Sequence, residues 1–179
     1  MTKPLLSTFA LGVALAALPG CPLLTVEAEV PEICLSYPNL TVETAVGATS
    51  TTQRFTFDDL SAVQDLLDDD ASLTFVRAEV RATSGIESFS FVDAVHVVAS
   101  SGAPGSTLPA LTIYDCDGDC VPEGSRLAIP ASTTGDAVAL LRTGSVAIDL
   151  DFQGTIPAAS WTIAVDVCMA AKAGYTVSP

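Results

Sequence analysis

The chain has 179 residues, with 21 Asp and Glu against seven Lys and Arg, which gives a formal net charge of −14. So few basic side chains argue against a nucleic-acid interface and against electrostatic attachment to anionic lipid, because both need clusters of Lys and Arg. The chain has one histidine, which excludes a catalytic metal centre built from several histidines.

The first twenty residues have the organisation of an export signal. Lys3 supplies a positive charge near the N-terminus, and residues 5–18 contain no charged side chain. A helix that spans a membrane needs about 20 apolar residues, so this stretch is too short to remain as a transmembrane anchor. We therefore expect residues 1–20 to be a signal peptide that is removed on export.

The end of this segment carries a candidate lipidation motif. Leu18, Gly20 and Cys21 stand where the lipobox of bacterial lipoproteins has an aliphatic residue, a small residue and the acylated cysteine, and the segment resembles that motif. Pro19 departs from the Ala, Ser or Thr more usual there. The resemblance ends at the cysteine and implies that Cys21 is diacylated and becomes the first residue of the mature protein. The alternative is an ordinary signal peptide that ends near a cysteine.

Removal of the signal peptide leaves 159 residues with six basic and 21 acidic side chains, a net charge of −15. This is the usual size of one domain. We expect residues 21–38 to form the lipidated N-terminus and an extended tether that leads into a first short strand, and residues 39–179 to form the domain. Two or more acyl chains on one residue anchor a protein stably, so lipid would hold it at the cell envelope. Pro22 stands where enteric bacteria place an aspartate for inner-membrane retention, which favours the outer membrane.

Four further cysteines, Cys34, Cys116, Cys120 and Cys168, predict two disulfides, because an even number of cysteines in an exported chain is normally oxidised. Three pairings are possible. We favour Cys116 with Cys120, which are close enough to close a small loop, and this leaves Cys34 with Cys168. A zinc site is the competing interpretation, but the chain has no Cys-x-x-Cys pair.

Alternation of apolar and polar residues predicts β-strands along most of the domain. The clearest strands are expected at 76–82, 146–152 and 161–167, with others at 40–46, 51–57, 89–98, 108–114, 126–129 and 137–141. In the strand at 89–98, Asp93 would fall on the apolar face unless a β-bulge changes the register.

One short helix is expected at 59–67, where Leu60, Val63, Leu66 and Leu67 share a face. Its C-terminal end carries an acidic run, made of Asp65, Asp68, Asp69 and Asp70. Charge runs of this kind are usually solvated, and cation binding is the alternative.

Many short strands joined by Gly-, Pro- and Ser-rich turns, without alternating helices, predict an all-β fold. We expect an antiparallel β-sandwich, Ig-like or jelly-roll-like, with one short α-helix. A β-barrel is the second choice.

The segment around Gly118 is a candidate calcium loop. Asp115, Asp117 and Asp119 alternate there and resemble the first half of a calcium-binding loop. The twelfth position counted from Asp115 is Arg126 instead of a carboxylate, which excludes an EF-hand. The alternative is a disulfide-closed hairpin turn in which Gly118 supplies a positive φ.

Nothing in the sequence indicates a catalytic triad. His96 lies among valines on an expected strand, and no Gly-x-Ser-x-Gly motif accompanies it. Asp149 and Asp151 are expected on the wet face of a strand. No glycine-rich loop of the kind that cradles nucleotide phosphates occurs.

We therefore expect a non-catalytic binding or structural role at the cell envelope, with a protein or polysaccharide partner. The chain needs no cofactor in this interpretation, although calcium at Asp115, Asp117 and Asp119 could assist. The alternative is a small envelope hydrolase that uses carboxylates. Its signature would be a concave apolar pocket that holds Asp93 or another acid with a raised pKa.

Overall fold

The computed structural model describes residues 24–64, 71–132, 135 and 137–177. Cys21, the rest of the expected signal segment and the aspartates at 65 and 68–70 lie outside the described residues. The elements follow one another as β1 (Leu24–Val42), β2 (Ser50–Phe57), α1 (Ser61–Gln64), β3 (Ala71–Ser84), β4 (Val92–Ser101), β5 (Leu111–Asp117), β6 (Pro122–Glu123), β7 (Arg126–Pro130), α2 (Val138–Leu141), β8 (Val146–Gly154) and β9 (Trp161–Val177). Neither of these short helices is long and apolar enough to cross a membrane.

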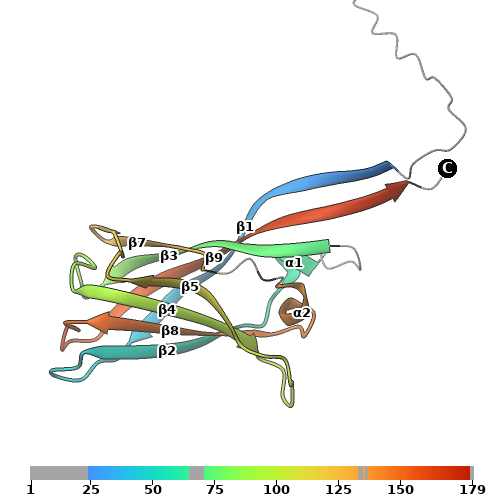
Figure 1. Ribbon diagram of the computed structural model, residues 1–179. Helices are drawn as coiled ribbons and strands as arrows, with labels where there is room; N and C mark the ends of the chain where they lie inside the picture. The colour runs from blue at the N-terminus through green and yellow to red at the C-terminus, as the bar shows by residue number, and fades with distance from the viewer. Residues whose placement is uncertain (1–23, 65–70, 133–134, 136, 178–179) are drawn as a thin grey trace, which may run out of the picture.

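Two antiparallel sheets pack face to face, which confirms the all-β sandwich (Figure 1). One sheet has the strand order β1-β9-β3-β7-β6 and the other has the order β2-β8-β4-β5. An isolated bridge between Tyr114 and Ala131 links β5 to the end of β7, so the two sheets approach each other along that side.

The core forms where the predicted alternation places apolar side chains on one face of a strand. In β8, Ile148, Leu150 and Phe152 are at most 1% exposed, whereas Asp149 and Asp151 are partly exposed on the other face. β9 alternates in the same way from Trp161 to Val167. Burial of one face and hydration of the other is what keeps these strands in register.

Aromatic side chains fill one end of the core. The ring centroid of Trp161 lies 5.3 Å from that of Phe152 and 6.0 Å from that of Phe89, and all three side chains are at most 1% exposed. Pairs at such distances add to the stabilisation that burial alone provides.

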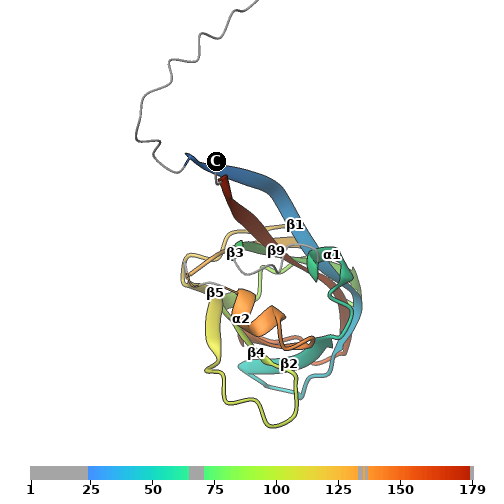
Figure 2. The same cartoon turned by 90° about the vertical axis from the view of Figure 1, so that its right-hand side faces the viewer.

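The opposite end of the core is closed by α2, as the view along the strands shows (Figure 2). A strand was expected at 137–141, and this expectation was wrong. Val138, Leu140 and Leu141 are all buried. A helical turn can bury neighbouring residues together, whereas a strand with one wet face buries alternate ones.

The expected tether is the second correction. Residues 24–38 belong to β1, so the boundary expected after residue 38 falls inside a strand. The physical reason is that β9 continues beyond the predicted strand 161–167 and provides backbone partners for β1 as far as Leu24.

Two local expectations concern Asp93 and the helix at 59–67. The register of β4 shifts between Val92 and Ala94, which leaves Asp93 exposed, so the β-bulge alternative applies and Asp93 does not lie on the apolar face. The helix is described only from Ser61 to Gln64. The Asp59 carboxylate accepts a 3.0 Å hydrogen bond from the Ser61 backbone N–H at its start. Hydrogen bonding to the Ser61 side chain, and secondarily to this backbone N–H, lowers the pKa of Asp59.

Both predicted disulfides are present. Cys34 and Cys168 are directly opposite each other in the β1–β9 ladder and are 134 residues apart in sequence, whereas Cys116 and Cys120 are four residues apart. The first disulfide therefore ties the beginning of the domain to its end, and the second closes one turn.

Removal of the two disulfides should destabilise the fold unequally. On the loop-entropy model, the Cys34→Ala/Cys168→Ala variant should lose about 5 kcal/mol of unfolding free energy and the Cys116→Ala/Cys120→Ala variant about 2 kcal/mol. Urea denaturation of the two variants and the parent protein measures both losses. Equal losses would show that loop length does not decide the difference.

Candidate functional site

The antiparallel topology gives the domain two different ends. β1 begins in a ribbon with the last part of β9, and this ribbon extends beyond the sandwich on the side of α1 and α2 (Figure 1). The far end carries the turns at 43–49, 85–91, 118–121 and 155–160, because β1, β3 and β5 end there and β2, β4 and β9 begin there. An anchor at the N-terminus and a partner at these turns would lie on opposite sides of the domain.

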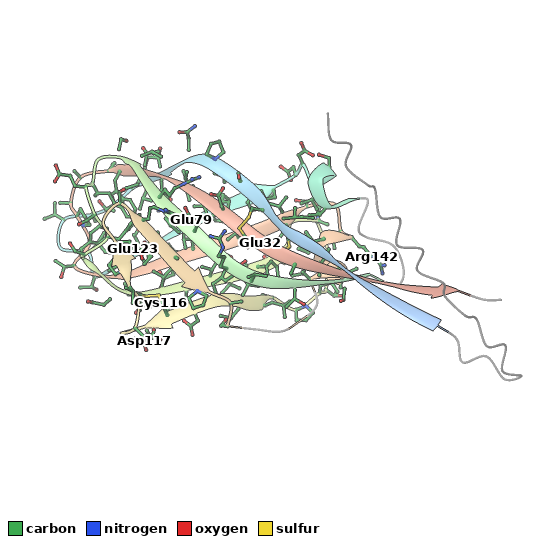
Figure 3. All side chains as sticks on the ribbon, turned by 90° about the horizontal axis from the view of Figure 1, so that it is seen from above. Glu32, Glu79, Cys116, Asp117, Glu123 and Arg142 are labelled. Carbon is green, nitrogen blue, oxygen red and sulfur yellow. A yellow bond between two sulfur atoms is a disulfide. The ribbon has the colours of Figure 1, made fainter. Side chains whose placement is uncertain are left out.

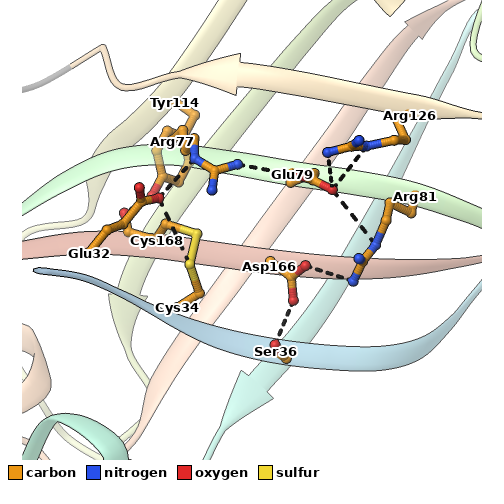
Figure 4. The surroundings of a disulfide bond; sticks show 10 residues. All are labelled: Glu32, Cys34, Ser36, Arg77, Glu79, Arg81, Tyr114, Arg126, Asp166 and Cys168. Atoms are coloured by element: carbon orange, nitrogen blue, oxygen red, sulfur yellow. Dashed lines mark hydrogen bonds and ion pairs between the residues drawn. A yellow bond between two sulfur atoms is a disulfide. The ribbon is translucent and has the colours of Figure 1, made fainter. Parts of the chain in front are cut away.

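A charged cluster lies on the outer face of the β1-β9-β3-β7 sheet, and Glu79 of β3 is at its centre (Figure 4). The Glu79 side chain is 10% exposed, and its carboxylate lies 2.9 Å from Arg126, 3.0 Å from Arg77 and 3.9 Å from Arg81. The hydrogen bond from Arg126, helped by the one from Arg77, holds the pKa of Glu79 below its usual value.

Two further carboxylates complete this Glu79 cluster. Arg77 forms a 2.8 Å ion pair with Glu32 beside the Cys34–Cys168 disulfide, and Arg81 forms a 2.8 Å ion pair with Asp166. The cluster therefore contains three arginines and three carboxylates, from β1, β9, β3 and β7, and their charges cancel. Because their charges are used within the cluster, we interpret it as a structural link between strands.

Tyr114 supports the cluster from the core side. Its hydroxyl donates a 2.9 Å hydrogen bond to the backbone carbonyl of Cys168, and the side chain is fully buried. Burial raises the pKa of Tyr114 well above its usual value, so the phenol remains a hydrogen-bond donor.

The structure gives two of the three aspartates of the candidate calcium loop a hydrogen-bond partner of their own. Asp115 lies on the outer face of β5, where its Oδ1 contacts Nδ1 of His96 on β4. Asp119 accepts a 3.0 Å hydrogen bond from the backbone N–H of Asp117. Gly118 has a φ of +73°, as the disulfide-closed turn requires. In Figure 3 this loop lies far from Arg142, which is at the ribbon end.

The candidate metal ligands that gather within the described part of the chain are elsewhere. Glu32, Cys34 and Cys168 form a group whose potential ligand atoms lie within 4.8 Å of one another. Both sulfur atoms belong to a disulfide, so neither is a thiolate ligand. Asp115, Asp117 and Asp119 do not form such a group in the described structure.

The groups considered for catalysis lie on the outer face of the second sheet. His96 is opposite Asp115 on one side and Asp151 on the other. Asp149 is 3.4 Å from Arg54, and Asp151 accepts a 2.7 Å hydrogen bond from Thr52. These contacts are typical of a hydrated sheet surface.

Two hollows lie at the ribbon end of the sandwich. One, of about 400 Å³, is lined by Asp58, Asp59, Leu60, Ser61, Leu141, Arg142 and Gly144. A smaller apolar one, of about 160 Å³, is lined by Leu108, Pro109, Leu111, Ala139 and Leu140. Neither contains Asp93, which is exposed. Asp59, which lines the larger hollow, has a lowered pKa instead of the raised pKa that the hydrolase alternative calls for.

Sequence reasoning did not find the Glu79 cluster. The available signal was the alternation of Arg77, Glu79 and Arg81 on one face of a predicted strand. Arg126 and Glu32 come from strands whose neighbours the sequence did not reveal.

No family model and no curated protein match the chain. Among solved structures, the chain is similar to an empty head of turnip yellow mosaic virus (12% identity, 96% of this chain and 92% of that chain, TM-score 0.25) and to desmodium yellow mottle tymovirus (13% identity, 99% and 98%, TM-score 0.26). It is also similar to turnip yellow mosaic virus (14% identity, 96% and 93%, TM-score 0.27). We build no argument on similarities this weak.

The Glu79 cluster predicts a pH-dependent loss of stability. Glu79→Gln should lower the unfolding free energy by about 1–2 kcal/mol at pH 7, because the arginines lose a charged acceptor but remain partly hydrated. A lowered pKa in the folded state stabilises the fold at pH values above about 4.3, and this contribution disappears as the pH falls through the folded-state pKa of Glu79. The difference between the two proteins should therefore shrink with acidification. Urea denaturation at several pH values measures it.

Asp149→Asn is the matched control, because Asp149 forms a 3.4 Å ion pair with Arg54, whose side chain is 61% exposed. It should cost less than about 0.5 kcal/mol at any of these pH values. An equal effect of the two substitutions would contradict a special role of the cluster.

Proposed function

We propose that the protein is a bacterial lipoprotein, anchored by acyl chains on Cys21, whose sandwich domain has a non-catalytic binding or structural role at the cell envelope. The observation that carries the proposal is the polarity of the fold. The N-terminal strand leaves the sandwich as a ribbon at one end, and the opposite end consists of turns (Figure 1). A domain tethered by its N-terminus would present those turns away from the membrane.

The turn end has features that suit contact with an envelope protein or polysaccharide. Val46 is 90% exposed and Val121 is 71% exposed, and both lie on turns at this end. Glu87 on a neighbouring turn and Glu123 in the short strand β6 are also exposed. Exposed apolar side chains among carboxylates offer both van der Waals and hydrogen-bonding contacts, and carboxylates also maintain solubility.

Two disulfides support a location outside the cytoplasm, where thiols are oxidised. Pro22 favours the outer membrane in a host with two membranes. The proposal includes no cofactor.

Acylation of Cys21 is the first prediction of this proposal. Mass spectrometry of the mature protein, purified from membranes in detergent, should find a diacylated or triacylated N-terminal cysteine. Cys21→Ala should abolish acylation and leave the precursor uncleaved at this site. Pro19→Ala, which introduces a residue more usual in a lipobox, should retain acylation. An unmodified N-terminus would refute the anchor.

Calcium binding is tested separately. Because Asp115 is paired with His96 and Asp119 with the Asp117 amide, we expect no saturable heat when calcium is titrated into the mature protein at neutral pH. The Asp117→Ala/Asp119→Ala variant serves as the comparison. Saturable heat that this variant lacks would make the loop a calcium site and add calcium to the proposed function.

A further inference from the structure

The outer strands of the two sheets differ in how their free edges are protected. A free edge exposes unpaired backbone N–H and C=O groups, and natural proteins normally interrupt, shorten or cover it. β1 pairs with β9 through two register shifts, and β6 is two residues long and begins with Pro122. β5 is covered in part, because the Ser132 N–H donates a 3.0 Å hydrogen bond to the Ile113 carbonyl.

β2 is the remaining outer strand, and it has none of these protections within the described part of the chain. Its eight residues, Ser50–Phe57, pair with β8 without a register shift and include no proline. In Figure 1 it is the lowest strand of its sheet, and no other strand lies beyond it. One side of β2 is therefore open along its whole length.

The alternation of the β2–β8 ladder shows which backbone groups of β2 point to this open side. The Gly154 N–H donates a 2.9 Å hydrogen bond to the Thr49 carbonyl, so this pair, next to the ladder, is a hydrogen-bonded one. The odd-numbered residues of β2 therefore bond to β8. Among the described residues, no backbone hydrogen bond occupies the outward N–H and C=O groups of the even-numbered ones. These are Ser50, Thr52, Arg54 and Thr56.

An apolar seam lies beside this edge, between the outer strands of the two sheets. Tyr37 of β1 is half-buried, and its ring centroid lies 4.8 Å from that of Phe55 and 6.2 Å from that of Phe57, both on β2. Side chains directly opposite each other on neighbouring strands are in contact. A strand added beside β2 would therefore place alternate side chains next to this seam.

The surroundings of the edge are acidic. The Glu43 carbonyl accepts a 3.3 Å hydrogen bond from the Thr51 hydroxyl, which places Glu43 beside the start of β2. Two aspartates directly follow the strand, and two more lie on the outer face of β8. Arg54 is the one basic residue of β2. Five carboxylates thus lie near a single guanidinium, and they belong to Glu43, Asp58, Asp59, Asp149 and Asp151.

We infer that the free edge of β2 is a docking site for an extended, basic segment of another protein, which joins the sheet as a fifth strand. Main-chain hydrogen bonds would provide affinity, as in other cases of strand addition. Apolar residues on the core-facing side of the segment would cover the seam. Lys or Arg at its two ends would lie near Glu43 and near Asp58 and Asp59. This surface is distinct from the turn end, and the inference does not depend on acylation of Cys21.

A second copy of the chain is a weaker candidate for the occupant. Antiparallel pairing of two β2 edges would join domains that each carry a net charge of −15, and their repulsion opposes association. It would also point the N-terminal ends of the two domains in opposite directions, whereas two lipid anchors in one membrane require the same direction.

The inference is tested with the acetylated and amidated peptide Lys-Lys-Val-Thr-Val-Thr-Val-Lys-Lys, titrated into the isotope-labelled mature protein. In antiparallel pairing its threonines lie opposite Thr52 and Arg54, so their amides bond to β2 and the valine amides point away. Amide exchange of Thr52 and Arg54, measured by NMR, should slow about tenfold at ten times the Kd of the peptide, because about one tenth of the protein then remains free. Exchange at Gln53, which already bonds to β8, should not change.

Matched controls separate edge pairing from other contacts. N-methyl groups on the two threonines of the peptide should abolish the protection, whereas N-methyl groups on two of its valines should not. In the protein, Thr52→Pro removes one outward N–H at a position where a sheet edge tolerates proline. It should weaken peptide binding about fivefold or more relative to Thr52→Val, which loses the hydroxyl alone. Emission of Trp161, which is 1% exposed, reports that each variant is folded.

Three outcomes would overturn the inference. The first is unchanged exchange at Thr52 and Arg54 at peptide concentrations that saturate a folded protein. The second is equal binding of a peptide with Glu in place of Lys, because the segment would then not need to be basic. The third is slow exchange at these residues that depends on protein concentration without any peptide, because the occupant would then be a second copy.

Discussion

The fold depends on the pairing of its first strand with its last. The β1–β9 ladder runs from the pair of Leu24 with Val177 to the pair of Val42 with Trp161, and the Cys34–Cys168 disulfide fixes it near its middle. Contacts between residues so distant in sequence cost much chain entropy, which a covalent link removes from the unfolded state. Once β9 is placed, it offers one edge to β1 and the other to β3. The remaining strands of that sheet follow from β3.

The same ladder explains how an acidic chain uses its few basic residues. Three of the six Lys and Arg residues beyond the signal segment are Arg77, Arg81 and Arg126, and all three surround Glu79. Their partners Glu32 and Asp166 lie on β1 and β9. The cluster thus links four neighbouring strands across the outer face of one sheet. Isolated surface ion pairs contribute little, but here a central carboxylate that is 10% exposed shares several donors, which makes the arrangement specific to one register.

Features that depend on the types and spacing of residues near one another in the chain could be predicted from the sequence. The strands at 76–82, 146–152 and 161–167 and both disulfides follow from residue type and spacing, whereas at Asp93 the sequence left open whether a bulge forms. The helix α2 was missed because a short apolar run suits a strand as well as a buried helical turn, and tertiary packing decides between them. The first strand was mistaken for a tether because its partner is at the other end of the chain. The Glu79 cluster was missed for the same reason. The three aspartates near Gly118 were singled out as a candidate calcium loop because of their spacing, but spacing alone could not reveal that His96 and a backbone amide contact two of them.

The direction of the strands connects the fold to its proposed role. β1 enters at the ribbon end and β9 returns there, so both ends of the described chain lie on one side and the far side carries turns alone. Turns tolerate sequence change because little packs on them, whereas the ladder cannot shift by one residue without moving Leu35 or Val165 out of the core. A scaffold of this kind can use its two ends for different roles. In the proposed arrangement, the paired first and last strands would fix the position of the domain relative to the N-terminal anchor, and the turns at the opposite end could vary with the partner.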